Sequence, residues 1–334
     1  MDGSAPPAPL LEEARALAAA REWSTLARRL EGAGEAELYA EPEAAFLYAD
    51  ALWRTGAPLA AVPIAERVLA AAGQRADRRL ILRVLNVLGI SLFHGGEMPR
   101  AEEVFGELLE RASEWEEEIF VARASNNLGM IENIRGRREV ALSSYQRAMA
   151  AYRRVGDQRG LAQTYHNLGI TFRDLGWDGE ADAHYRRAME LGEASNTADV
   201  VALAETERAL LRARSGDGKL AGEMAKRAVD RFERIGDPTG AAHAVRVLAA
   251  AERARGRDGE AMRHLESALE VARAHSDTLL AAEVQRDRGE MLRAAGDRDG
   301  ARAAFADAAE HFARIGAHAE AEAARAMEAE FSSS

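Results

Sequence analysis

The sequence predicts an all-α solenoid, a stack of antiparallel helix pairs, from two observations. Glycines recur at intervals of forty residues, each with a small residue seven positions earlier and an alanine five positions later. These glycines are Gly96, Gly136, Gly176, Gly216, Gly256 and Gly296. Prolines are rare after Pro99, where only Pro238 remains, so helices can fill the rest of the chain. A fixed period of this length indicates a repeated supersecondary unit.

Residues 158–197 illustrate one repeat. Apolar residues follow helical spacing over residues 158–175, which predicts a first helix, A. Gly176 is expected to end helix A, because glycine readily adopts the positive φ found at helix C-termini. Asp178 is expected to be the N-cap of a second helix, B. The repeat is therefore predicted to be two antiparallel helices joined by a tight turn.

Small residues are expected to bring the two helices close together. Gly169 on helix A and Ala181 on helix B allow the backbones to approach, and Tyr185 is expected to fill the space beside them. The same position on helix B holds a large side chain in most repeats. This column reads Phe105, Tyr145, Tyr185, Ala225, Leu265 and Phe305.

The pattern extends toward both ends of the chain. One period before Gly96 lies Gly56, which adds a seventh repeat although Pro58 and Pro63 make its turn irregular. The predicted divisions are a disordered start at 1–9, an irregular helix pair at 10–42, seven repeats at 43–316, a capping helix at 317–331 and a disordered end at 332–334.

Composition and charge exclude several classes of function. The 334 residues include no cysteine, which excludes a disulfide framework, a thiolate metal site and a cysteine nucleophile. The net charge of −11, with both signs mixed, argues against binding to nucleic acid. No apolar run is long enough to insert into a membrane, and the first residues, with no basic segment or apolar run, lead us to expect no secretory leader. We therefore expect a cytoplasmic protein.

The sequence offers no pattern typical of catalysis. The eight histidines form no pair with metal-ligand spacing on one helix face, and no Gly-Lys-Ser/Thr follows the glycine-rich turns. Runs of carboxylates such as Glu116–Glu118 are typical of solvated helix faces. We therefore expect no enzyme, no cofactor and no metal site.

The repeat resembles the tetratricopeptide repeat. The residues that carry the resemblance in one repeat are Asn167, Leu168, Gly169, Phe172, Gly176, Ala181, Tyr185 and Ala188. The period of forty rather than thirty-four, without a closing proline, is similar to the repeats of kinesin light chains and of bacterial regulators that sense peptides. The resemblance covers about 43–316. It implies a right-handed superhelix whose A-helices line a concave groove that holds partner proteins or peptides, without catalysis.

The groove is expected to have three zones. Its start is aromatic, and its middle is rich in amides and basic groups. Its end mixes charges, for which we favour solvated ion pairs within the groove; these residues are Arg246, Arg253, Arg286, Arg293, Glu283, Asp287 and Glu290. The candidate partner-binding residues are Arg83, Asn86, Phe93, Arg123, Asn126, Asn127, Asn133, Gln163, His166, Asn167 and Arg173.

The asparagines in this zone need an explanation, because asparagine is a poor helix former. Their amides suit paired contacts with the N–H and C=O of an extended peptide, and Arg123 and Arg173 are expected to hold carboxylates of the ligand. The alternative is that the asparagines bond to neighbouring repeats or face water.

Three hypotheses of function follow. The first is an interaction scaffold that binds a partner peptide or helix in the groove. The second is a peptide-responsive regulator that releases a partner when a ligand binds. The third is a structural protein that assembles into a homo-oligomer through its terminal helices.

Overall fold

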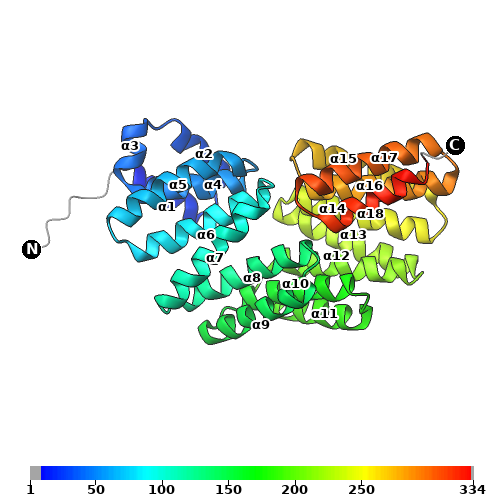
Figure 1. Cartoon of the computed structure of the whole chain (residues 1–334), viewed down its shortest axis with the longest axis horizontal. Helices are drawn as coiled ribbons and strands as arrows, with labels where there is room; N and C mark the ends of the chain where they lie inside the picture. The colour runs from blue at the N-terminus through cyan, green and yellow to red at the C-terminus, as the bar shows by residue number, and fades with distance from the viewer. Residues whose placement is uncertain (1–8, 332–334) are drawn as a thin grey trace, which may run out of the picture. The chain divides into compact units, whose positions relative to one another are not determined.

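The structure, a computed structural model, describes residues 9–331. These residues form α-helices joined by short turns, with no strand among them (Figure 1). The helices are α1 (Pro9–Ala19), α2 (Trp23–Glu31), α3 (Glu35–Ala40), α4 (Pro42–Arg54), α5 (Pro58–Gln74), α6 (Arg78–His94), α7 (Met98–Glu114), α8 (Glu118–Ile134), α9 (Arg138–Val155), α10 (Gln158–Asp174), α11 (Asp178–Ala194), α12 (Ala198–Arg214), α13 (Gly218–Ile235), α14 (Pro238–Ala254), α15 (Asp258–Ala274), α16 (Thr278–Ala295), α17 (Arg298–Arg314) and α18 (His318–Ala329). The predicted all-α solenoid is therefore confirmed.

The helices follow the predicted alternation of A and B. The A-helices are the even-numbered ones from α4 to α16, and each is followed by its B-helix. Before them lie α1 and α2, with a short additional helix, α3, that the sequence pattern did not indicate. After them comes α18. The expectations for residues 1–8 and 332–334 lie outside the described residues.

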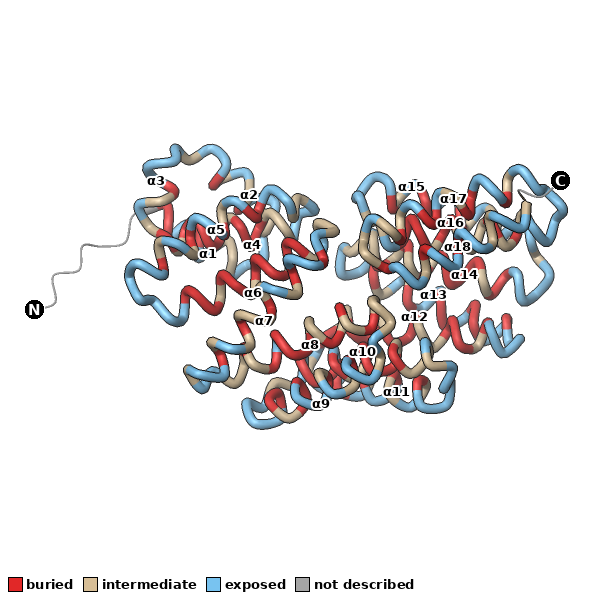
Figure 2. Tube along the Cα trace, viewed as in Figure 1, coloured by how far each residue is buried: buried red, intermediate tan, exposed pale blue. Residues whose placement is uncertain are grey.

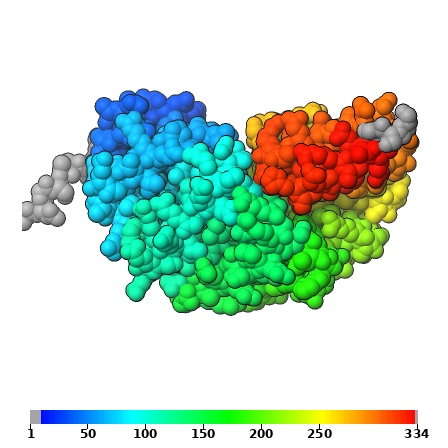
Figure 3. All heavy atoms as spheres, in the orientation of Figure 1, coloured from blue at the N-terminus to red at the C-terminus, as the bar shows by residue number. Residues whose placement is uncertain are grey.

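The chain divides into two compact units, Met1–Leu128 and Gly129–Ser334, and the division falls within α8. Each unit has its own core. Buried residues run along the facing sides of neighbouring helices, and exposed residues gather at the turns (Figure 2). Side chains fill the spaces between neighbouring helices of each unit (Figure 3).

Left-handed turns set the helix length. The glycine column has positive φ throughout, as at Gly96 (82°) and Gly176 (79°). A second residue with positive φ occurs halfway between these glycines, at each turn from a B-helix to the next A-helix. It is Ala76 at the first of these turns and Glu116 at the second. A left-handed residue every twenty positions interrupts the helix and leaves helices of 17 or 18 residues from α5 to α17.

The predicted N-cap of α11 is wrong by one position. Trp177 occupies the N-cap, and Asp178 is the first helical residue, with no side-chain cap. Its carboxylate still lies at the positive end of the helix dipole. Aspartate caps do occur at other helices, where Asp157 accepts a hydrogen bond from Gly160 N at 2.9 Å and Asp237 one from Gly240 N at 2.9 Å.

The predicted close approach of helices A and B is confirmed. A Cβ atom on Gly169 would lie 2.3 Å from Cε1 of Tyr185, whose side chain is fully buried. The same relation joins Gly129 to Tyr145, with a distance of 2.7 Å to Cε1. The glycine is required because the aromatic ring of helix B occupies the volume that any larger side chain on helix A would need.

Candidate partner-binding surfaces

The structure places every candidate residue on an A-helix. In the first unit, α6 carries Arg83, Asn86 and Phe93, and the first part of α8 carries Arg123, Asn126 and Asn127. In the second unit, the end of α8 carries Asn133, and α10 carries Gln163, His166, Asn167 and Arg173. The two groups are described separately below.

Five of the second unit's polar side chains form one hydrogen-bonded set. Arg173 donates to the carboxylate of Glu207 on α12 and, at 2.8 Å, to that of Asp174. Asn133 Nδ2 donates to Asp174 Oδ2 at 3.0 Å, and the Tyr185 hydroxyl donates to Glu207 at 3.4 Å. Together with His166 and Asn167, we call these residues the central network.

The ion pair between Arg173 and Glu207 remains charged. Burial would raise the pKa of the Glu207 carboxyl, but the positive charges of Arg173 and Arg246 and the hydrogen bond from Arg173 outweigh it and hold this pKa below its usual value. Burial would lower the pKa of Arg173, yet Glu207 and Asp174 hold it well above its usual value. Arg173 is thus occupied within the protein, and our proposals do not assign it to a ligand carboxylate.

His166 contributes an unused acceptor to the central network. Its Nδ1 lies 3.3 Å from Asn167 Oδ1, and its ring stacks obliquely on Tyr185 with centroids 5.9 Å apart. Burial lowers the pKa of His166 despite the opposing charge of Glu207, so the ring is neutral near pH 7. Because an amide oxygen only accepts, the proton sits on Nδ1, and Nε2 is left as an acceptor.

Two acceptors of the central network are buried without a hydrogen-bond partner among the described residues. They are Nε2 of His166 and Oδ1 of Asn133, and both side chains belong to residues that are 7% exposed. Asn133 donates through Nδ2 to Asp174, and its Oδ1 is left as the buried acceptor. A buried polar atom without a partner costs about 1–3 kcal/mol, and such atoms in a native structure point to a missing donor.

A second cluster continues along the A-helices. Arg246 on α14 lies 3.1 Å from Glu283 and 2.7 Å from Asp287, both on α16. His243 lies 3.5 Å from Asp277 and 3.7 Å from Glu283. We call these residues the Arg246 cluster. The predicted ion pairs of this zone are present, and Arg246 itself is buried rather than solvated.

The Arg246 cluster forms one wall of a cavity of about 630 Å³ in the second unit. Residues of the A-helices α12, α14 and α16 line it together with α18 and with Leu265 of α15. Its apolar lining consists mainly of small and flexible side chains, namely Leu210, Ala213, Ala249, Ala250, Ala254, Leu265, Met291, Ala323 and Met327. Arginines and carboxylates stand around them.

The first unit presents amides and aromatic rings. Asn86 Oδ1 is buried without a partner among the described residues. At the expected aromatic start of the groove, the His94 ring stacks on Trp53 with centroids 5.8 Å apart and meets the Phe93 ring edge-on with centroids 5.4 Å apart. Asn126 is buried, whereas Arg123 is exposed. In the second unit, Gln163 is also exposed and forms no hydrogen bond with a described residue.

Sequence reasoning did not select Asp174 or Glu207 as site residues. Glu207 lies one period after Asn167, at the same groove position, so its place was visible in the register. The pairing was not visible, because Arg173 reaches Glu207 across 34 positions, whereas Arg246 reaches Asp287 across 41. These sequence separations between paired residues depend on the direction in which each side chain points, and not only on the forty-residue period.

Other kinds of site find no support in the described part of the chain. No three histidine, aspartate or glutamate side chains there are arranged to hold a metal ion. No helix in residues 9–331 has the length and apolar character needed to span a bilayer.

Comparison with known proteins gives the fold. Residues 120–194 match the family model of the tetratricopeptide repeat. No curated protein shows a significant match. A Rap protein solved in complex with competence and sporulation factor has a TM-score of 0.65 at 15% identity, covering 97% of this chain and 96% of its own.

Two further solved structures are similar. The Rap conjugation gene regulator of plasmid pLS20, in complex with the Phr* peptide, has a TM-score of 0.57 at 16% identity over 78% of this chain and 77% of its own. Aspartyl phosphate phosphatase F from Bacillus subtilis has a TM-score of 0.53 at 13% identity over 100% and 96%. Residues 120–194 are therefore tetratricopeptide repeats, and the chain has the same solenoid fold as these proteins. At these identities the likeness shows the fold alone.

Proposed function

We propose that this chain is a non-catalytic interaction scaffold that binds an extended segment of a partner protein along the A-helices of its second unit. The observation that carries the proposal is the pair of buried acceptors, Asn133 Oδ1 and His166 Nε2, in a network that is otherwise satisfied. Each requires an N–H donor, and the described residues do not supply one.

The missing donors match the chemistry of a peptide main chain. An extended peptide offers N–H groups that no secondary structure of its own consumes, and a tetratricopeptide groove can receive it with the side chains held in pockets. The central network is fixed by the Arg173–Glu207 ion pair, so the two acceptors are held in place before the ligand arrives. Such preorganisation reduces the entropy lost on binding.

The cavity beside the Arg246 cluster supplies the apolar part of the site. Its volume of about 630 Å³ and its lining of alanine, leucine and methionine suit a large apolar side chain of the bound segment. Methionines such as Met291 and Met327 adapt their shape to different side chains. Main-chain contacts would therefore give affinity, and this cavity would select the side chain.

Two of the structural relatives are consistent with this proposal. One was solved with competence and sporulation factor and the other with the Phr* peptide, which shows that the same fold accommodates such ligands in those proteins. Transfer of that role to this chain is our proposal.

The proposal is tested by selecting ligands on the full chain from a phage-displayed library of random nonapeptides, followed by calorimetric titration of a selected peptide. The double variant Asn133→Ala with His166→Phe removes both acceptors and keeps an aromatic ring against Tyr185. We expect its affinity to fall about 10–100-fold, since each lost hydrogen bond is worth ~1 kcal/mol or more.

A matched control is Gln146→Ala, which removes an exposed amide from the B-helix α9. It should bind the peptide as the wild type does. Recovery of no peptide from the library, or equal affinity of the double variant, contradicts the proposal.

A ligand-responsive regulator is the second candidate, favoured by the relative described as a gene regulator in complex with a peptide. A regulator changes its conformation when the ligand binds, because the ligand must prefer one state. Small-angle scattering of the full chain with and without a selected peptide separates the two. A changed radius of gyration favours the regulator, and an unchanged one favours the scaffold. Light scattering that reports a multiple of 36.2 kDa without ligand would favour self-assembly.

A further inference from the structure

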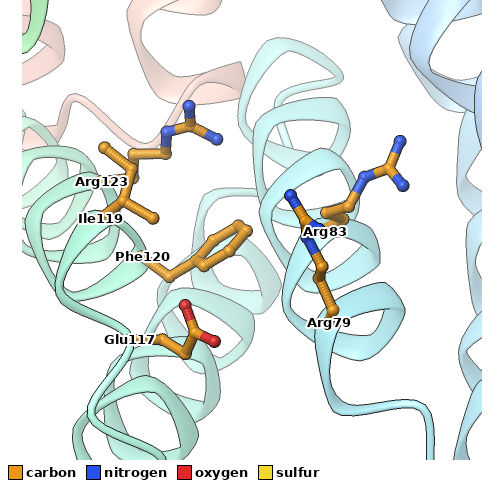
Figure 4. Close-up of a pocket in the computed structure, with 6 residues that line it drawn as sticks. All are labelled: Arg79, Arg83, Glu117, Ile119, Phe120 and Arg123. Carbon is orange, nitrogen blue, oxygen red and sulfur yellow. The ribbon is translucent and has the colours of Figure 1, made fainter.

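A second pocket lies in the first unit, between the N-terminal turns of α6 and α8. It has a volume of about 400 Å³. Figure 4 shows its lining, with α6 on one side, α8 on the other and Phe120 between them. The lining residues are Arg79, Arg83, Glu117, Ile119, Phe120 and Arg123. Of these, only Arg83 and Arg123 were candidates from the sequence.

The pocket holds more positive than negative charge. Three guanidinium groups face a single carboxylate, that of Glu117. Arg83 is held in place, since it lies 3.1 Å from Glu43 and 4.3 Å above the ring of Phe46. Glu43 is itself shared with Arg15. The pocket therefore keeps an excess of about two positive charges.

Arg79 and Arg123 are the groups available to a ligand. Both are exposed, and neither forms an ion pair with any residue that the structure describes. Several arginines on the A-helices of the second unit behave differently, because they pair with a carboxylate on the next A-helix or at the end of α18. Examples are Arg173 with Glu207, Arg246 with Asp287, Arg253 with Glu290 and Arg293 with Glu330.

Apolar surface adjoins the arginines. Ile119 and Phe120 form the α8 side of the pocket, and the guanidinium carbon of Arg123 lies 5.5 Å from the centre of the Phe120 ring. Guanidinium groups pair with planar or tetrahedral oxyanions through two hydrogen bonds at once, and they do so best beside apolar surface that excludes water.

We infer that this pocket binds a doubly anionic group of a protein segment, with a neighbouring apolar side chain against Ile119 and Phe120. Two sources supply such a charge, a phosphorylated side chain and a pair of adjacent carboxylates. The inference rests on the proposed function in one respect, namely that the ligand in this pocket is a protein segment. It adds the chemistry by which the first unit would select that segment.

The test uses the fluorescently labelled full chain on an array of acetylated, amidated nonapeptides with random flanks. The central pair is Ser-Ser, phosphoserine-Ser, Glu-Glu or Lys-Lys. We expect at least one doubly anionic set to bind about tenfold more tightly than the Ser-Ser set, as expected for one or two charge-assisted contacts. The set that gains identifies the source of the charge.

Variants locate the effect. Arg79→Gln with Arg123→Gln should abolish the gain without changing the melting temperature, because both side chains are exposed. Arg28→Gln removes an exposed charge from α2 of the same unit and should keep the gain.

Three results would overturn the inference. In the first, the anionic sets bind no better than the Ser-Ser set. In the second, the gain in affinity survives in the double arginine variant. If peptides still bind the chain in either case, the inference fails and the proposed function stands. If no set binds at all, the proposed function fails as well.

Discussion

Arg246 on α14 lies 2.7 Å from Asp287 on α16, one repeat further along the chain. The pair shows that the forty-residue register brings successive A-helices side by side, so that side chains at nearly equivalent positions, here 41 residues apart, form an ion pair. With Glu283 it makes the Arg246 cluster a structural part of the second unit rather than a set of solvated charges. The following predictions test the structural and the functional parts of this description.

Removal of the Arg246 guanidinium should destabilise the protein strongly. Arg246→Ala removes a buried guanidinium that contacts two partly buried carboxylates, those of Glu283 and Asp287, which costs about 3 kcal/mol. Arg253→Ala breaks an ion pair whose arginine is 41% exposed and should cost about 0–1 kcal/mol. Urea denaturation followed by circular dichroism measures both. Equal losses would show that burial of the pair has no energetic weight.

Gly169→Ala should destabilise the second unit. The added methyl would lie 2.3 Å from Tyr185, so the ring must move, at a cost of about 1–3 kcal/mol. Gly179→Ala serves as control, because no atom lies within 4 Å of its new Cβ, and it should be neutral or slightly stabilising. Thermal melting of the two variants compares them. A Gly169→Ala protein as stable as the wild type would contradict the packing described here.

At the left-handed turns between repeats, alanine-to-glycine and glycine-to-alanine substitutions should change the stability of the protein in opposite directions. Ala76 has φ of 54°, which is strained for alanine, so Ala76→Gly should stabilise the protein by about 0.5–1 kcal/mol. Gly236 has φ of 70° at an equivalent turn, so Gly236→Ala should destabilise it by a similar amount. Denaturation midpoints report the sign, and two changes of the same sign would refute this account of the turns.

Stability should depend on pH through His243. Burial lowers its pKa, but the hydrogen bond to Asp277 and the charges of Glu283 and Asp277 outweigh burial and the repulsion of Arg246, so the pKa is raised. The folded state thus binds the proton more tightly than the unfolded state, whose pKa is about 6.5. The stabilisation is fully present below that value and is lost as pH rises through the folded pKa.

The measurement is the free energy of unfolding of the wild type and of His243→Gln between pH 5.5 and 9. The difference between the two proteins should shrink as pH rises, by ~1.4 kcal/mol for each unit of pKa difference. A difference that grows with pH would reverse the assigned sign.

Sequence reasoning reached the fold because its signals are local. A glycine with φ near 80° recurs in each repeat, and a small residue recurs on helix A where helix B packs closely, so a single sequence displays both positions. The N-cap of α11 was placed one residue too late, at Asp178 instead of Trp177, because the geometry of the preceding turn decides which residue is the cap.

The candidate site was predicted only in part. The register put Asn133, His166 and Arg173 on one kind of helix, but it did not show which polar groups satisfy one another. Arg173 forms ion pairs with Glu207 and Asp174, whereas Nε2 of His166 has no hydrogen-bond partner among the described residues. These outcomes depend on rotamers and on the spacing between helices, since one step along a helix turns a side chain by about 100°. The pocket at Arg79 and Phe120 lies one turn before the expected groove columns and was not anticipated.

The most direct test of the central claim is a crystal structure of the full chain with a library-selected peptide. We predict that N–H groups of the peptide lie about 2.7–3.2 Å from both Asn133 Oδ1 and His166 Nε2. A peptide bound on the B-helices or the turns, with both acceptors still without a donor, would contradict it.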